Sequence, residues 1–429
     1  MPAKNRHSWY VVGLLTVCYV LSLIDRLIVG LLVEPMKASL GLSDFEIALL
    51  QGPAFAILYA VLGVPLGRVA DIWNRKNLIS IAIALWSVAT MGCGLAGGFI
   101  SLLIARIGVG VGEAALSPSA YSMFADMFDK GRLGRAISVF TVGGIAGVGL
   151  SLLLGGALFG YFSSIGPVSL LGFGVLLPWQ MTFVVLGIPG IAIAFVIYFG
   201  VQEPERAGAQ RTVEPVAAVA GYIIGHGRFY ASIFVLHALI AGVLYGFYNW
   251  APSYLIRDFA MGPQIVGPRF GLLAIAAGIT GPLLAGWIAD RLQVRYGATA
   301  PLFTAGGFFA VLAVVSLFAF RADTFELALV GCGMVALFGS AMLGLPPIAL
   351  QLATPNRMRG QVSGLSLMIS NLVGLGAGPV VIAGLSEFVF PDQGLGFVLM
   401  VVIATTSVCG AALGFWATLK ADRKILGNE

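Results

Sequence analysis

Twelve long apolar runs, joined by short polar segments, restrict this chain to a membrane-spanning architecture. A helix needs about 20 apolar residues to cross the hydrocarbon core of a bilayer. The runs lie near 9–33, 46–66, 78–97, 99–124, 133–159, 180–200, 229–256, 268–288, 300–320, 325–352, 362–386 and 395–418. Only 10% of the residues are charged, whereas soluble domains carry roughly 25%. We therefore predict an all-α membrane protein with twelve transmembrane helices and almost no extramembrane domain.

The basic residues orient these predicted helices. Of the 24 Lys and Arg residues, 18 fall at one set of helix ends and four at the opposite ends. This asymmetry is typical of the positive-inside rule. It predicts a multi-pass membrane protein with both termini in the cytoplasm. The net charge of +5 is explained by this distribution, so we predict no nucleic-acid partner.

An internal repeat divides the chain into two halves. Gly67-Arg-Val-Ala-Asp71 ends the second run, and Gly286-Trp-Ile-Ala-Asp290 ends the eighth. We predict an N-terminal six-helix bundle over 1–200, a cytoplasmic linker over 201–227 and a C-terminal six-helix bundle over 228–429. Two pseudo-symmetric bundles that rock about a site at the midplane are typical of secondary transporters. The apolar segment 160–179 is too short to span, and we expect it to lie along the membrane surface.

Four charged residues lie inside the first and fourth runs. Asp25 and Arg26 stand in the middle of Cys18–Leu32, while Arg106 and Glu113 lie seven residues apart. Seven helical steps of about 100° bring Glu113 within about 20° of the face of Arg106, about 10 Å deeper. Asp25 and Arg106 have similar depth, so we expect them to pair. Arg26 is long enough to reach Glu113, so these four charges line one face of the first bundle.

Charges inside a membrane cost about 2.5–3.5 kcal/mol each on insertion scales and are functional by default. We interpret this cluster as a proton-coupling and substrate site. Burial favours a neutral carboxylic acid and a neighbouring guanidinium favours the carboxylate. An anionic headgroup that engages Arg26 would therefore favour protonation of Glu113, although Asp25 is the alternative proton carrier. The structural alternative is a static network that only holds the two helices together.

Three motifs carry a resemblance to a known family. Gly67–Lys76 resembles the signature loop of the major facilitator superfamily, although Ile72 replaces its usual basic residue and Asn74 its usual Gly. Arg106–Gly112 resembles the fourth-helix motif of that family. The Gly-rich segment Gly143–Gly156 resembles its fifth-helix motif without the usual Pro. The resemblance covers the whole chain and implies two six-helix bundles with alternating access.

A narrower resemblance is to the Spinster-like branch of this family. It rests on Asp25-Arg26, on Arg106 with Glu113, and on Asn249–Leu255 in the seventh run. That branch is associated with export of sphingosine-phosphate and lysolipids. The resemblance implies an amphiphilic anionic substrate, either a lysolipid or a sphingolipid-like molecule, moved by a proton-coupled carrier. The same fold acting on a small organic anion, such as a sugar acid or an aromatic carboxylate, is the alternative.

The signature loop also implies a gating latch. In this family the Asp and the basic groups of the loop hold the two halves together when the cytoplasmic side is closed. The near-copy at Asp290 favours this role over a solvated charge cluster that only sets topology. The candidate residues are Gly67, Asp71, Arg75, Lys76, Asp126, Arg135 and Asp290.

Further candidates for a role in substrate binding lie in the second half of the chain. We consider as possible cavity-lining residues His237, Tyr245, Tyr248, Asn249 and Asn371. A lone buried His is more often an interhelical hydrogen-bonding group, and aromatic residues near helix ends are commonly interfacial anchors. A cavity charged on one wall and apolar on the other would suit an amphiphile.

Other classes of protein lack support in the sequence. No phosphate-binding Gly-Lys-Ser/Thr loop, Ser-His-Asp set or metal-ligand cluster is recognisable, so we expect neither an enzyme nor a cofactor. The four cysteines all lie in apolar runs and are expected to pack as small apolar residues. We expect a monomer whose partners are the substrate, protons and membrane lipid.

Overall fold

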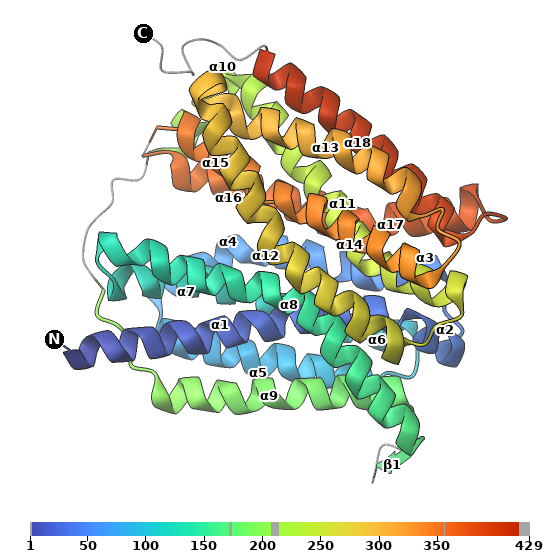
Figure 1. Cartoon of the computed structure of the whole chain (residues 1–429). Coiled ribbons are helices and arrows are strands. Elements are labelled where there is room, and N and C mark those ends of the chain that lie inside the picture. The colour runs from blue at the N-terminus through green and yellow to red at the C-terminus, as the bar shows by residue number, and fades with distance from the viewer. Residues whose placement is uncertain (1, 171–173, 207–213, 356, 420–429) are drawn as a thin grey trace. The chain divides into compact units, whose positions relative to one another are not determined.

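The computed structural model describes residues 2–170, 174–206, 214–355 and 357–419, and most of these residues are helical (Figure 1). The helices of the first part of the chain are α1 (Pro2–Leu31), α2 (Val33–Leu40), α3 (Asp44–Gln51), α4 (Pro53–Ile72), α5 (Arg75–Gly94), α6 (Phe99–Glu113), α7 (Leu116–Met127), α8 (Lys130–Ile165) and α9 (Pro178–Gly200). The later helices are α10 (Val216–Gly225), α11 (Gly227–Phe259), α12 (Pro263–Tyr296), η1 (Gly297–Thr299), α13 (Ala300–Ala319), α14 (Phe325–Met342), α15 (Leu345–Ala353), α16 (Arg359–Ser370), η2 (Asn371–Leu375), α17 (Gly376–Gly384), η3 (Leu385–Val389) and α18 (Leu395–Leu419).

The predicted number of membrane-spanning helices is confirmed. Within the described residues, eleven helical stretches are long and apolar enough to cross a membrane. One of them, Pro263–Ala319, contains two such helices, α12 and α13, separated by the short η1 turn. The eleven stretches therefore supply twelve membrane-length helices.

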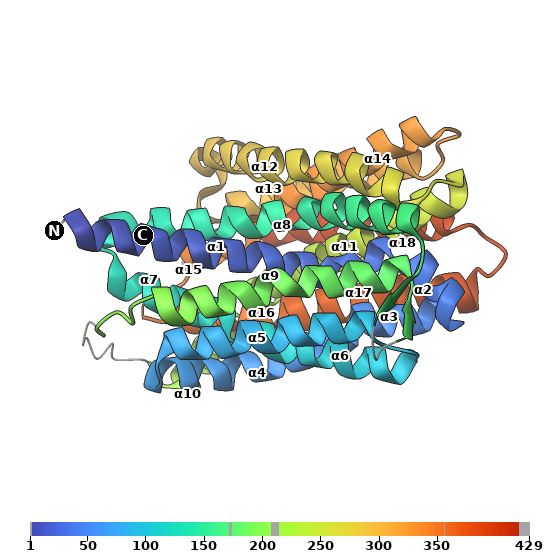
Figure 2. The ribbon, with the colours of Figure 1, turned by 90° about the horizontal axis from the view of Figure 1, so that it is seen from below.

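The chain forms two compact units. Unit 1 comprises Met1–Gly208 and Ala260–Ile275, and unit 2 comprises Ala209–Phe259 and Ala276–Glu429. In unit 1, α5 packs against α9 and α6, and α1 packs against α8 (Figure 2). In unit 2, α13 packs against α18 and α14, while α11 packs against α16, η2, α17 and α18.

The abundant glycines of α8 let α1 approach closely. A Cβ atom on Gly147 would lie 2.8 Å from the Cβ of Leu23 and 3.1 Å from the carbonyl oxygen of Val20. Helices in a bilayer gain stability mainly from such close packing, because lipid tails are as apolar as the helices themselves. The Gly-rich segment Gly143–Gly156 is thus part of the surface that holds α1.

Several predicted spans are interrupted. The second span breaks at Gly52, between α3 and α4, and the fourth breaks between α6 and α7 directly after Glu113. The eleventh contains two π-helical segments, η2 and η3. Pro53 at the start of α4 has no N–H to complete a continuous helix, and π-helical turns are frequent at functional sites.

A small hairpin replaces part of the segment that was expected to lie on the membrane surface. Helix α8 continues to Ile165, and the strands β1 (Val168–Leu170) and β2 (Gly174–Leu176) then pair antiparallel, with Val168 opposite Leu176. The sequence prediction missed both the length of α8 and this hairpin, because three-residue strands leave no recognisable alternation.

A bulky residue at Gly147 is expected to destabilise unit 1. Gly147→Val would force α1 away from α8, and overpacking of this kind costs about 1–3 kcal/mol. The matched control is Gly134→Val on the same helix, where an added Cβ meets no atom within 4 Å. We expect a lower apparent melting temperature for Gly147→Val alone, measured by size-exclusion chromatography after heating. An equal loss in both variants would contradict the packing account.

Candidate functional site

A buried ion pair joins α1 to α6. The Nη2 of Arg26 donates to Oε2 of Glu113 at 2.7 Å, and the Oγ of Ser22 donates to the same oxygen at 2.6 Å. The side chains of Arg26 and Glu113 are 5% and 0% exposed. The predicted reach of Arg26 to Glu113 is confirmed. Among the described residues, Oε1 of Glu113 is buried and has no hydrogen-bond partner.

Two aromatic rings of α4 flank the guanidinium of Arg26. Its Cζ lies 4.5 Å from the centroid of Phe55 and 4.9 Å from that of Tyr59. The ring of Phe55 is also 5.7 Å from Cζ of Arg106. A cation over an aromatic face is stabilised by about 2 kcal/mol or more when both are desolvated. This site therefore presents a cation, a carboxylate and an apolar aromatic surface together.

Arg106 is bound by backbone carbonyls and forms no ion pair with Asp25. It donates to the carbonyl oxygens of Asp25 at 2.9 Å, Arg26 at 3.3 Å and Leu50 at 3.2 Å. The expected pairing with the Asp25 carboxylate is wrong, since no ion pair joins the two side chains in the described part of the chain. The guanidinium instead ties α1, α3 and α6 together through peptide groups.

Asp25 itself is buried in the same bundle. The residue as a whole is 3% exposed, and its side chain lies beside Thr90 of α5. All four predicted charges therefore gather within unit 1, with the pair Arg26–Glu113 at its centre and Asp25 close to it. The assignment of a proton to either carboxylate stays a prediction.

Glycines of α6 allow its neighbours to approach the ion pair. A Cβ on Gly110 would lie 2.7 Å from the carbonyl oxygen of Phe55, and a Cβ on Gly112 would lie 2.7 Å from the Cβ of Trp86. The Gly-x-Gly-x-Gly pattern after Arg106 thus brings α4 and α5 against α6 just before Glu113. This contact also positions the aromatic rings of α4 beside Arg26.

The sequence prediction missed Gln51, the last residue of α3. It is 1% exposed, and neither its Oε1 nor its Nε2 has a hydrogen-bond partner among the described residues. The carbonyl of the preceding residue, Leu50, accepts a hydrogen bond from Arg106. Gln51 therefore directly follows, in sequence, a residue that contacts the charged cluster. The signal in the sequence was a polar amide directly before Gly52-Pro53 within an otherwise apolar run.

A second charged cluster lies at the end of unit 1 where α5 begins. The buried guanidinium of Arg75 donates to Asp126 at 2.5 Å and to Glu203 at 2.7 Å. It also bonds to Ser122 and to the carbonyl of Pro204. Glu203, in the segment after α9, additionally accepts the backbone N–H of Lys76 at 2.8 Å. Glu203 was missed because its position far along the chain gave no sign of this contact.

The structure brings together only part of the predicted latch. The cluster contains Arg75, Lys76 and Asp126. A Cβ atom added to Gly67 would lie 3.9 Å from the Cβ of Pro118. Asp71, Arg135 and Asp290 are exposed, and no ion pair of theirs occurs among the residues described. The latch role of all seven residues stays a prediction.

The candidate residues of unit 2 make mainly interhelical and local contacts. Nδ1 of His237 lies 2.8 Å from Oγ of Ser366, which links α11 to α16. Nδ2 of Asn249 donates to the carbonyl of Tyr245 in its own helix, while its buried Oδ1 has no partner in the described part of the chain. Tyr248 is buried, and Asn371 is half-buried at the first position of η2.

No group of three or more His, Cys, Asp or Glu side chains that would suit a metal ion occurs among the described residues. The charged side chains gathered in unit 1 are the carboxylates of Asp25 and Glu113 and the guanidinium groups of Arg26 and Arg106.

Comparisons with known proteins agree with this arrangement. The model of the Major Facilitator Superfamily matches residues 15–379. An MFS-type efflux pump of Mycolicibacterium smegmatis is 27% identical over 424 residues, which cover 98% of this chain and 95% of that protein. Protein spinster homolog 1 of Homo sapiens is 26% identical over 446 residues, with 95% and 80% covered.

A solved structure is also similar. It is the crystal structure of a bacterial homolog to the human lysosomal transporter Spinster, in an inward-facing and unoccupied conformation. The TM-score is 0.84 at 26% sequence identity, and the match covers 98% of each chain. The predicted resemblance is confirmed by these matches.

Replacement of Arg106 by lysine is expected to loosen unit 1. A single ammonium group cannot reach all three carbonyls of α1 and α3 that the guanidinium binds, and each lost hydrogen bond to a charged group costs about 1.5–3 kcal/mol. Arg106→Lys should lower the apparent melting temperature, whereas the exposed control Arg295→Lys should not. Equal apparent melting temperatures for the two variants would contradict a structural role of Arg106.

Proposed function

Because the chain belongs to the Major Facilitator Superfamily, we propose that it is a proton-coupled secondary transporter of an amphiphilic anion of the lysolipid or sphingolipid type. Members of this family are membrane carriers that alternate access to a site rather than enzymes. The chain is a multi-pass membrane protein, and we place it in the bacterial inner membrane with both termini in the cytoplasm, as a monomer. Its similarity to an efflux pump and to a spinster homolog supports a transporter, and the choice of substrate class follows the Spinster-like resemblance of the charged motifs.

The observation that carries the proposal is the buried pair of Arg26 and Glu113. A buried carboxylate is tolerated while a guanidinium faces it, and becomes costly once that guanidinium is engaged elsewhere. An anionic headgroup competes with Glu113 for Arg26. When the headgroup binds Arg26, Glu113 loses its partner and takes up a proton, which removes the unpaired charge. Substrate and proton are thereby coupled through one side chain.

The surroundings of Arg26 suit an amphiphile. Phe55 and Tyr59 lie within 5 Å of its guanidinium carbon, so an anion bound there meets aromatic surface next to the cation. A small hydrophilic anion would leave these rings without a matching apolar group. Gln51 follows Leu50, whose carbonyl accepts from Arg106, and both of its amide atoms are buried without a partner among the described residues; we propose that it supplies a further donor and acceptor for a polar headgroup.

The substrate class is tested by flux into proteoliposomes. A fluorescent lysolipid is compared with a small aromatic carboxylate, each with and without an imposed pH gradient. The proposal expects lysolipid flux that responds to the gradient. Flux of the small carboxylate alone would overturn the lipid substrate and establish the organic-anion alternative.

Glu113→Gln is expected to abolish the response of flux to the pH gradient, because the amide cannot take up or release the proton. The volume of the side chain is nearly unchanged, so folding is expected to be retained and is checked by size-exclusion chromatography. Glu205→Gln, at an exposed position, is the matched control and should transport as the wild type does. Gradient-driven flux at the wild-type rate in Glu113→Gln would remove this carboxylate from the mechanism.

We also propose that the last turn of α4, together with the start of α5, acts as a gating latch. Asp71 is exposed and close in sequence to Arg75, which two carboxylates already hold. Asp71→Asn should lower the rate of flux at least several-fold and leave substrate affinity unchanged, since it affects the conformational cycle and not the site. Asp392→Asn, which is also exposed, is the control. Unchanged turnover in Asp71→Asn would rule out the latch.

A further inference from the structure

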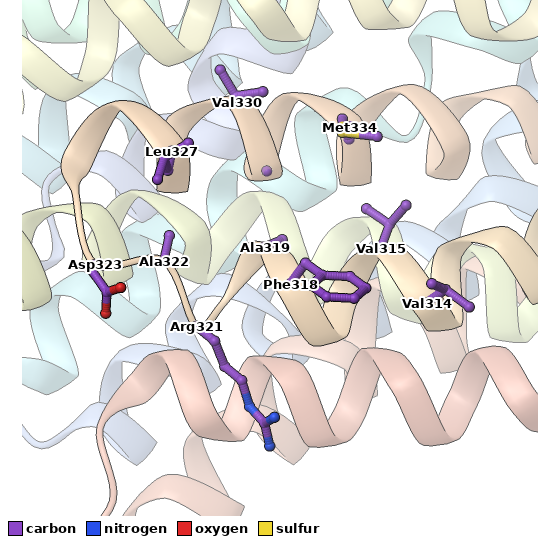
Figure 3. Close-up of a pocket in the computed structure, with 11 residues that line it drawn as sticks. Val314, Val315, Phe318, Ala319, Arg321, Ala322, Asp323, Leu327, Val330 and Met334 are labelled. Carbon is purple, nitrogen blue, oxygen red and sulfur yellow. The ribbon is translucent and has the colours of Figure 1, made fainter.

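An open groove lies between α13 and α14 within unit 2 (Figure 3). Its volume is about 400 Å³. We call it the α13–α14 groove. It is lined by Val314, Val315, Phe318, Ala319, Arg321, Ala322, Asp323, Leu327, Val330, Gly331 and Met334. Apolar side chains follow its length, and the two charged residues stand on the turn at one end (Figure 3).

The apolar part of the groove is open to the surroundings of the protein. Phe318 is 74% exposed, Leu327 is 61% exposed and Val330 is 56% exposed. Both α13 and α14 belong to stretches long and apolar enough to cross a membrane. Such side chains on a spanning helix meet acyl chains, so the groove offers a fitted surface to one lipid tail.

The charged end of the groove lies where the two helices meet. Helix α13 ends at Ala319 and α14 begins at Phe325, which places Arg321 and Asp323 on the connecting turn. Both are exposed, and neither forms an ion pair among the described residues. A turn between two spanning helices lies at the border of the hydrocarbon, at the depth of lipid headgroups.

We propose that the α13–α14 groove binds one zwitterionic phospholipid that carries a primary ammonium group, such as phosphatidylethanolamine. An acyl chain fills the apolar groove, the phosphate binds Arg321, and the ammonium binds Asp323. The charge balance selects this headgroup. One arginine accompanies one aspartate on this turn, so a zwitterionic headgroup finds a partner for each of its two charges, whereas a purely anionic headgroup leaves Asp323 facing a like charge.

The proposal is tested on the purified full chain by native mass spectrometry, with phosphatidylethanolamine, phosphatidylcholine and phosphatidylglycerol titrated separately. We expect one phosphatidylethanolamine to bind more tightly than either of the others. Arg321→Gln should weaken that binding about fivefold, the effect of one basic residue at a lipid headgroup. Asp323→Asn should remove the preference over phosphatidylcholine, whose ammonium has no N–H to donate.

Two further variants separate the groove from general effects. Val330→Trp fills the groove with an indole ring at a position that faces outward, so it should reduce binding while the protein stays monodisperse. Arg295→Gln, an exposed arginine elsewhere in unit 2, should bind lipid as the wild type does. Equal binding of the three lipids, tighter binding of phosphatidylglycerol, or a dimer that Val330→Trp dissociates would each overturn the proposal.

Discussion

The ion pair between Arg26 and Glu113 is the interaction on which unit 1 depends. Its two charges are buried in helices whose residues are mostly apolar, and either one left alone would be strongly destabilising. Ser22 and the rings of Phe55 and Tyr59 surround the pair. The glycines of α6 permit this enclosure, because a Cβ on Gly110 would collide with the backbone of Phe55. Close packing and buried charge are therefore parts of one arrangement.

The charge of Arg106 suggests an ion pair with a carboxylate, but its guanidinium binds backbone carbonyl groups instead. It binds carbonyl oxygens of α1 and α3 and so fixes the helix that carries Arg26. In the proposed mechanism the carboxylates of Asp25 and Glu113 are the groups that can exchange a proton. In that mechanism only Arg26 changes partner when an anion binds, while Arg106 keeps its three carbonyl contacts.

The sequence was sufficient to predict the twelve spans and the gathering of four charges, because both follow from apolar run length and from the helical period that places Glu113 on the face of Arg106. It was insufficient for the partners of Arg106, since backbone carbonyls are present at every residue and leave no pattern. Gln51 and Glu203 were missed for a related reason. Their roles depend on the break at Gly52 and on the path of the chain after α9, which are set by tertiary packing.

The proposed coupling requires an anion to displace Glu113 from Arg26, so that Glu113 takes up a proton. Calorimetric titration of the purified protein with a lysolipid, repeated in buffers of different ionisation enthalpy, measures the number of protons bound per substrate. We expect uptake of close to one proton by the wild type near neutral pH, and none by Glu113→Gln. Substrate binding without proton uptake by the wild type, or the same uptake in both proteins, would contradict the proposed coupling.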